Sequence, residues 1–298
     1  MPPTSPTTAK TLAVPALIAL LCVVWSSTWW AIRICLEHQP PLSSAAVRFL
    51  IAGVAMAALA PRLLRREAAP PPPLWLWSIA GACNFAGSYG ILYVAETVVP
   101  SGIAAVLWAI FPLLMAGCGV LFLDERLRPR QWLGFAVAFA GIVAVFWSDL
   151  GGVPDDQTGF AWLLLASPVV AATGTTLVKR YGSKTSSVVL NRNGLLLGAA
   201  MLAAAALLRE DPLAMAWTPH VTIATLYLAL IGTTMTFGIY FWLLRTVPAS
   251  RLALITYVTP VLAMLLATAV GDGSHGALAW SGAGGVVFGI ALVVARRR

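Results

Sequence analysis

Long apolar stretches, separated by short polar connections, follow one another along nearly the whole chain. A helix needs about 20 apolar residues to cross a hydrocarbon layer about 30 Å thick. The pattern therefore predicts an all-α integral membrane protein with ten transmembrane helices and no soluble domain. These helices cover, approximately, residues 12–32, 43–61, 74–95, 101–123, 131–148, 159–178, 186–208, 220–244, 251–270 and 277–295.

The composition agrees with this interpretation. The chain of 298 residues is 59% hydrophobic and only 10% charged, with a mean hydropathy of +0.86, whereas soluble domains are about 25% charged. The first stretch is expected to stay in the protein as a helix, because the segment AIRICLEHQ after it lacks the small-x-small site of a signal peptide. The net charge of +8 does not indicate nucleic-acid binding, since the basic residues lie at helix ends and form no patch with aromatic residues.

Basic residues divide unequally between the two sides of this topology. Fifteen of the 19 lysines and arginines fall on the side that carries both termini, and the other side holds only Arg33 and Arg209. Because cytoplasmic loops carry an excess of basic residues, we expect a multi-pass protein of the inner cell membrane with both termini in the cytoplasm. Arg48 and Arg192 begin the second and seventh helices, where they either extend to the headgroups or form an ion pair or gate.

The chain repeats itself. The segment TVVPSGIAAVLWAIFP, residues 97–112, returns as RTVPASRLALITYVTP, residues 245–260. Two prolines and three glycines recur 148 positions later without a gap: Pro100, Pro112, Gly90, Gly134 and Gly141 match Pro248, Pro260, Gly238, Gly282 and Gly289. This predicts a first five-helix repeat over residues 1–148, a link over 149–158 and a second repeat over 159–298.

Five helices are an odd number, so the second repeat must enter the membrane from the opposite side. Two inverted repeats typically enclose a site near the middle of the membrane, which rocking of one half against the other exposes to each side in turn. The symmetry therefore predicts a transporter that works by alternating access.

The chain also resembles the drug/metabolite transporter superfamily, and in particular its EamA-type exporters. The segment LDERLRPRQWLGFAVAFAG carries the resemblance, with Glu125 before a basic stretch and then Gly134 and Gly141, together with the proline pair Pro112 and Pro260. The second repeat departs from the pattern, because it has Asp272 and Gly273 where the family often has a second acidic residue. The resemblance implies export of small metabolites such as amino acids through a cavity lined by the first, third and fourth helices and their equivalents.

Polar and aromatic side chains on helix faces are the candidates for the cavity. Asn84 and Ser88 are four residues apart and share a face, as do Thr236 and Tyr240 in the second repeat. The candidates for substrate binding are Trp25, Ser26, Asn84, Ser88, Trp108, Thr236, Tyr240 and Tyr257, and those for helix kinks or gating are Pro112 and Pro260. Plain packing between helices is the alternative for each of them.

Ionisable residues are scarce within the predicted helices. Glu37 and Glu96 fall at the outer helix ends, where we expect them to be hydrated, and no aspartate, glutamate or histidine is predicted at the membrane midplane. This argues against an obvious proton carrier. It also favours neutral, zwitterionic or amphipathic substrates, with amino acids foremost.

No cofactor or metal is expected. The four cysteines lack CxxC spacing, and the three histidines lie on separate outer loops. The expected partners are a small-molecule substrate and the lipid bilayer, and the oligomeric state stays open. An integral-membrane enzyme acting on lipid or isoprenoid substrates is the alternative function. Its support is Asp155 with Asp156, which also suit a polar hinge between the repeats.

Overall fold

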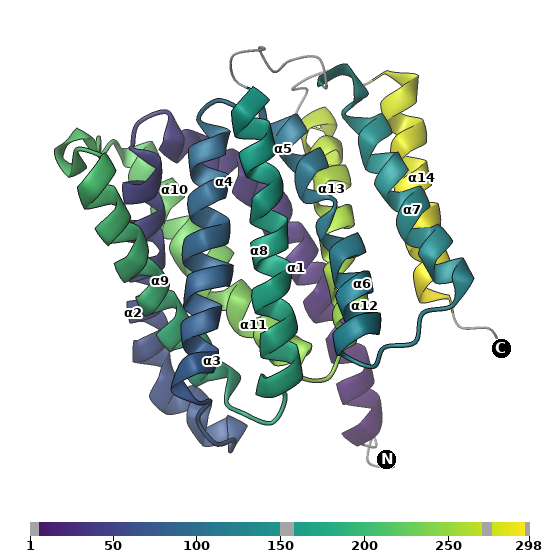
Figure 1. Cartoon of the computed structure of the whole chain (residues 1–298), viewed down its shortest axis with the longest axis horizontal. Coiled ribbons are helices and arrows are strands. Elements are labelled where there is room, and N and C mark those ends of the chain that lie inside the picture. The colour runs from purple at the N-terminus through teal and green to yellow at the C-terminus, as the bar shows by residue number, and fades with distance from the viewer. Residues whose placement is uncertain (1–5, 150–157, 270–275, 296–298) are drawn as a thin grey trace.

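The computed structural model describes residues 6–149, 158–269 and 276–295, and in these ranges every regular element is a helix (Figure 1). The acidic residues Asp155, Asp156 and Asp272, which the sequence analysis considered, lie outside the described residues. The α-helices of the first half are α1 (Pro6–Leu36), α2 (Pro41–Glu67), α3 (Leu74–Ile79), α4 (Ser88–Glu96), α5 (Ser101–Trp108), α6 (Phe111–Phe122) and α7 (Pro129–Val145). Those of the second half are α8 (Thr158–Gly182), α9 (Ser187–Arg209), α10 (Pro219–Ala229), α11 (Thr236–Leu244), α12 (Ala249–Ala253), α13 (Ile255–Ala269) and α14 (Ala277–Val294).

Four short elements complete the described chain. Two are π-helical turns, η1 (Ala80–Gly87) between α3 and α4, and η5 (Leu230–Met235) between α10 and α11. Two are 3₁₀ turns, η2 (Trp147–Asp149) and η4 (Pro212–Ala214). The π turns occupy corresponding places in the two halves, and both lie in the middle of the bundle where π turns often accompany functional sites.

The expected all-α membrane class is confirmed. Within the described ranges, eight helical segments are long and apolar enough to cross a membrane. Two of the ten expected crossings are not among them. α7 has 17 residues and counts as a shorter apolar helix, and the crossing expected over residues 74–95 is divided among α3, η1 and α4. The number ten therefore stays a prediction.

Helices α2 and α9 pack side by side and antiparallel, and each carries a glutamate that caps the other. Glu67, the last residue of α2, accepts hydrogen bonds from the backbone N–H groups of Ser187 at 2.8 Å and Val188 at 3.4 Å, at the start of α9. Glu210, just after α9, accepts them from Leu42 and Ser43 at the start of α2, both at 2.8 Å. A carboxylate at a helix N-terminus satisfies free N–H groups and is favoured by the helix dipole.

Helices α7 and α14 form a second antiparallel pair at the other end of the bundle (Figure 1). A Cβ atom on Gly134 would lie 2.6 Å from the carbonyl oxygen of Gly289, and one on Gly141 would lie 2.7 Å from that of Gly282. In the opposite direction, a Cβ atom on Gly289 would lie 2.5 Å from the carbonyl oxygen of Gly134, and one on Gly282 would lie 2.6 Å from that of Gly141. The recurring glycines are therefore required by direct backbone contact between the two halves, as small residues are at close crossings of membrane helices.

The two prolines of the repeated segment occupy different local positions. Pro112 is the second residue of α6, directly after the interruption that separates α6 from α5. Pro260 lies inside α13 without interrupting it. Neither proline has an N–H to donate to the carbonyl four residues earlier, which belongs to Trp108 in one half and to Thr256 in the other.

Candidate functional site

A central cavity lies between the helices of the two halves. Helices α1, α4, α5 and α6 and the turn η1 line it from the first half, and α8, α11, α12 and α13 line it from the second. Its volume is about 110 Å³, below the roughly 300–1,000 Å³ of a typical ligand pocket. The described lining contains no aspartate, glutamate, lysine or arginine.

Five of the predicted binding residues line this cavity together. They are Trp25, Asn84, Ser88, Trp108 and Tyr240. Thr236 lies directly behind the lining, because its hydroxyl accepts a hydrogen bond of 3.1 Å from the Trp25 indole N–H. The helical spacing of Asn84 with Ser88 therefore did place both side chains on the face that meets the cavity.

Two of the predicted binding residues lie elsewhere. Ser26 is buried away from the cavity, and its hydroxyl donates to the Val23 carbonyl at 2.6 Å. Tyr257 is fully buried in a separate apolar cluster with Phe135 and Val286, and its hydroxyl donates to the Phe135 carbonyl at 3.2 Å. The positions of these two residues agree with packing between helices, which was the alternative to substrate binding.

Asn84 is the central polar side chain of the lining. Its amide nitrogen donates to the Thr175 hydroxyl at 2.7 Å and to the Ala171 carbonyl at 3.2 Å, both on α8, whereas its amide oxygen is buried without a partner. A Cβ atom at Gly174 would lie 2.3 Å from that oxygen, so only glycine leaves room for it. A buried acceptor with no donor is costly, and this one is enclosed against Gly174 of α8, next to the cavity that Asn84 lines.

Ser167 on α8 holds the Trp108 ring and was not predicted. The Trp108 indole N–H donates to the Ser167 hydroxyl at 3.2 Å, and that hydroxyl donates to the Ser88 carbonyl at 2.8 Å. The serine lies next to Pro168 in a run that reads as ordinary membrane helix. Its partners come from α4 and α5, so no spacing along α8 itself indicates the contact.

Aromatic rings form the rest of the wall. The Trp25 ring lies 5.5 Å from that of Phe237 and 5.6 Å from that of Tyr240, in tilted arrangements, and the Trp108 ring lies 5.5 Å from Phe111. Rings at these distances stabilise each other and present their faces to a cation or an aromatic group. The cavity therefore combines aromatic surfaces with a few neutral polar groups.

One interpretation of the position of Arg48 was that it extends to the headgroups. The structure buries it instead. Only 1% of the residue is exposed. Its guanidinium donates to the Thr233 hydroxyl at 2.9 Å and to the Tyr93 hydroxyl at 3.0 Å, and it lies 5.1 Å from the centre of the Tyr89 ring. Since Tyr89 also lines the cavity, this buried cation stands directly behind the cavity wall.

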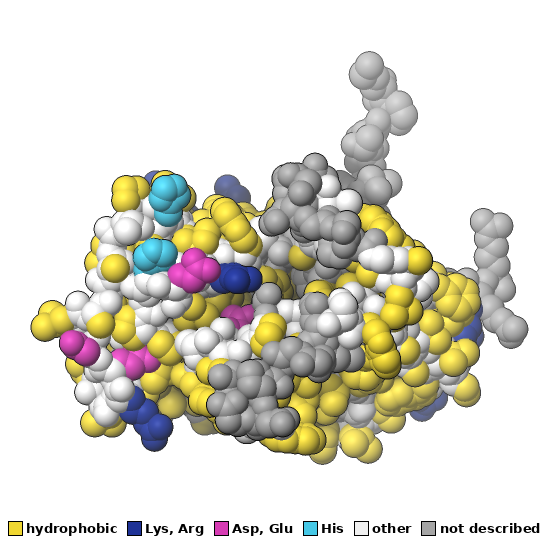
Figure 2. All heavy atoms as spheres, turned by 90° about the horizontal axis from the view of Figure 1, so that it is seen from above, with side chains coloured by type: hydrophobic (Ala, Val, Ile, Leu, Met, Phe, Trp, Pro, Cys, Tyr) yellow, Lys and Arg dark blue, Asp and Glu magenta, His cyan; other side chains and the backbone are white. Residues whose placement is uncertain are grey.

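The expectation that Glu96 is hydrated is wrong. Both of its carboxyl oxygens are buried, and neither has a hydrogen-bond partner. We name the face that carries the α1–α2 connection the outer face, following the predicted topology, and the opposite face the inner face. Glu96 lines a hollow at the outer face with Trp29, Arg33 and Glu37, which we name the outer vestibule. Figure 2 looks onto this face and shows acidic and basic side chains side by side there.

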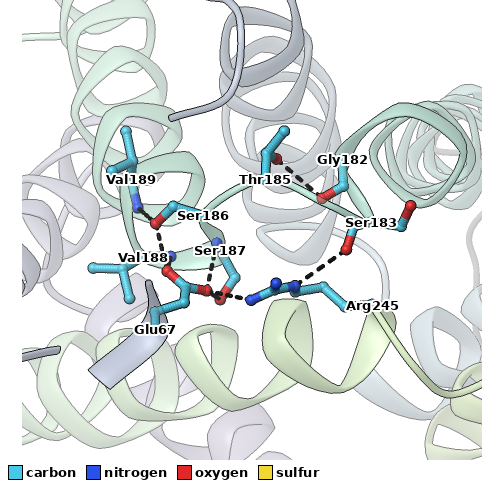
Figure 3. Close-up of polar contacts among 9 residues, drawn as sticks. All are labelled: Glu67, Gly182, Ser183, Thr185, Ser186, Ser187, Val188, Val189 and Arg245. Carbon is cyan, nitrogen blue, oxygen red and sulfur yellow. Dashed lines mark hydrogen bonds and ion pairs between the residues drawn. The ribbon is translucent and has the colours of Figure 1, made fainter. Parts of the chain in front are cut away.

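The inner face is held by an ion pair that the sequence interpretation did not single out. Arg245, directly after α11, donates to Glu67 of α2 at 2.7 Å and to the Ser183 carbonyl at 3.2 Å (Figure 3). Glu67 also accepts from the hydroxyls of Ser186 and Ser187, so it joins α2, α9 and α11. The Glu67 side chain is only 6% exposed. Nearby, Lys179 of α8 donates to two backbone carbonyls, those of Leu244 at 2.6 Å and Val247 at 2.9 Å.

The fold and its apolar helices define the class as a multi-pass helical membrane protein. The chain belongs to the EamA-like transporter family, whose profile matches residues 13–147 and again residues 158–295. The predicted membership of the drug/metabolite transporter superfamily is thereby confirmed.

Individual relatives agree with this family. The Uncharacterized inner membrane transporter YedA of Escherichia coli strain K12 is 35% identical over 93% of this chain and 89% of its own. Protein PagO of Salmonella typhimurium is 24% identical over 86% and 84%. One crystal structure with 20% identity superposes with a TM-score of 0.80 over 94% of this chain and 95% of its own, which supports the fold alone.

Proposed function

We propose that this transporter exports small metabolites, most of all amino acids or related zwitterionic and amphipathic solutes, by alternating access. The observation that carries the proposal is the central cavity itself. Trp25, Asn84 and Trp108 from the first half face Thr175 and Tyr240 from the second. A site shared by two halves is the arrangement that rocking of one half against the other can open to either side.

The inverted relation between the halves is part of this proposal. The reciprocal caps of Glu67 and Glu210, and the mutual glycine contacts of α7 with α14, are what an in-plane twofold axis between residues 1–148 and 159–298 requires. We propose ten crossings with both termini in the cytoplasm. Because its relative YedA is an inner membrane transporter by name, we propose the inner membrane for this protein as well.

The chemistry of the lining supports the substrate class. A strongly anionic solute needs a basic residue in the cavity, and the described lining has none. Aromatic faces suit an ammonium group or an aromatic ring. Pro112 and Pro260 cannot donate to the Trp108 and Thr256 carbonyls, which belong to residues that line the cavity, and these carbonyls are the acceptors that we propose for an ammonium group.

The two faces differ in a way that supports alternating access. Trp29 lines both the central cavity and the outer vestibule, so the two spaces adjoin. Toward the inner face, Val178 and Phe241 line a space of only about 10 Å³. Beyond them lies the ion pair of Glu67 and Arg245. We therefore propose that the structure represents an outward-facing state and that this pair is the inner gate.

Exchange of amino acids across a membrane tests the proposed function. Purified protein is reconstituted into vesicles loaded with an unlabelled amino-acid mixture, and entry of radiolabelled amino acids is compared with that into protein-free vesicles. We expect exchange that depends on the protein and that Trp108→Ala reduces. No exchange of any amino acid would contradict the proposed substrate class.

A further inference from the structure

Glu96 is a buried acid whose surroundings supply nothing to hold a negative charge. It is the last residue of α4, and both carboxyl oxygens lack hydrogen-bond donors. Leu92, Ala95 and Val99 next to it belong to an apolar cluster with Ile103. In such a place an ionised carboxylate without donors costs much more free energy than the neutral, protonated acid.

The charged and titratable groups around Glu96 come from three helices. At the end of α1, Arg33 and the following Glu37 lie in the same vestibule, but they pair with each other at 3.4 Å and their side chains are 71% and 56% exposed. On α2, Arg48 is a buried cation. On α4, Tyr93 lies one turn before Glu96 and accepts the hydrogen bond from Arg48. The described vestibule residues from 97 to 102 carry no charge.

These groups make the protonation of Glu96 depend on conformation. Arg48 has no carboxylate among its hydrogen-bonding partners, and Glu96 has no cation among its own. A movement of α4 against α1 or α2 changes the distance of Glu96 from Arg33 or Arg48, and with it the stability of the carboxylate. The vestibule supplies water on one side, and Trp29 marks its junction with the central cavity on the other.

We propose that Glu96 is a proton-binding site through which this chain couples export to proton entry. The inference rests on the transport activity proposed above. In the outward-facing state a proton from external water binds the Glu96 carboxylate and forms an O–H bond. After the vestibule closes and the cavity opens inward, the proton leaves to water in the cavity, while the substrate crosses in the opposite direction. No electron transfer or co-reactant is needed.

Driven accumulation of amino acids tests the coupling. Vesicles with an acidic interior are diluted into more alkaline buffer with the membrane potential clamped at zero, and uptake of radiolabelled amino acids is followed. For one proton per substrate, a gradient of one pH unit supports at most about tenfold accumulation. We expect the wild type to accumulate label several-fold, and Glu96→Gln to reach only equal concentrations while still exchanging amino acids.

Glu37→Gln is the matched control, because Glu37 lines the same vestibule but is exposed and paired with Arg33. It should accumulate label as the wild type does. Driven accumulation retained in Glu96→Gln would overturn the proposal. Exchange without driven accumulation in the wild type would also overturn it, and would leave the proposed export function standing.

A titration without substrate separates the two proposals further. Infrared difference spectra of the purified protein between acidic and alkaline pH should contain a protonated-carboxyl band that Glu96→Gln removes and Glu37→Gln leaves in place. If no amino acid is exchanged, the proposed substrate class fails, and this band alone decides the proton site. Its presence in the Glu96→Gln spectrum would overturn the assignment. If Glu96→Gln does not fold, Glu96→Asp replaces it, because aspartate keeps the carboxyl on a side chain that is one methylene shorter. An unchanged pH midpoint of the carboxyl band in Glu96→Asp would count against the site.

Discussion

Replacing Arg245 with glutamine tests the proposed inner gate most directly. The substitution removes the 2.7 Å contact between the Arg245 guanidinium and Glu67, whose side chains are 23% and 6% exposed. Glu67 keeps its donors from Ser186, Ser187 and Val188 at the start of α9. The helix cap therefore survives, and the protein should still fold.

The size of the effect follows from the contact that is lost. A hydrogen bond to a charged group contributes about 1.5–3 kcal/mol. If the contact exists only in the outward-facing state, its loss shifts the equilibrium toward the inward-facing state by about ten- to hundredfold. A contact present in both states would change stability and leave the equilibrium where it was.

Labelling of a cysteine beneath the cavity measures this shift. Val178 is 5% exposed and lies in the closed region toward the inner face. In a background without the four native cysteines, Val178→Cys should react with a membrane-impermeant maleimide from the inner face about ten- to hundredfold faster when Arg245→Gln is present. Arg180→Gln is the control, because Arg180 lies on the same face, is exposed and donates only to the Phe122 carbonyl. Unchanged labelling in a variant with a normal melting temperature would refute the gate.

The same structure predicts the outcome of three single substitutions and of two reporter fusions. Trp108→Ala should weaken substrate affinity by roughly two- to thirtyfold with a near-normal melting temperature, since it removes stacking and cation–π contacts of about 0.5–2 kcal/mol. Tyr257→Ala should instead destabilise the fold by about 3–5 kcal/mol, with flux per folded molecule unchanged. Melting temperature and flux are measured on the same samples of both variants. If Trp108→Ala and Tyr257→Ala changed these two quantities in the same way, the assignment of Trp108 to binding and Tyr257 to packing would be wrong. Gly141→Leu should abolish folded protein in a size-exclusion assay, because its side chain would meet backbone at 2.7 Å; a monodisperse, active variant would count against tight contact of α7 with α14. A reporter fused after Arg298 should be active in the cytoplasm and one inserted near Asp155 outside, as the basic residues predict, and the reverse pattern would contradict the topology.

Much of the architecture follows from local features of the chain. Hydropathy marks the apolar helices because each must satisfy its own backbone and expose apolar side chains to lipid. The offset of 148 residues identified glycines that the structure brings into contact, Gly134 with Gly289 and Gly141 with Gly282. These properties depend on residue type and spacing, so the sequence is sufficient for them.

The same offset contained a signal that the residue assignment missed. The position 148 residues after Trp108 is Thr256, which does line the cavity, and not its neighbour Tyr257. A helix turns by about 100° per residue. A shift of one position therefore moved the prediction from the cavity face to the cluster around Phe135.

Only the tertiary structure decided the environments of the charged residues. Arg48, Glu96 and Arg245 all lie near helix ends in the sequence, where hydration is the natural expectation. The fold buries Arg48 against Tyr93 and Thr233, leaves the Glu96 oxygens without donors and pairs Arg245 with a residue 178 positions away. The sequence by itself determined which segments form apolar helices and which residues recur, because these depend on composition and period. Burial and pairing depend on which other helix arrives at each position, and that is fixed only when the helices pack.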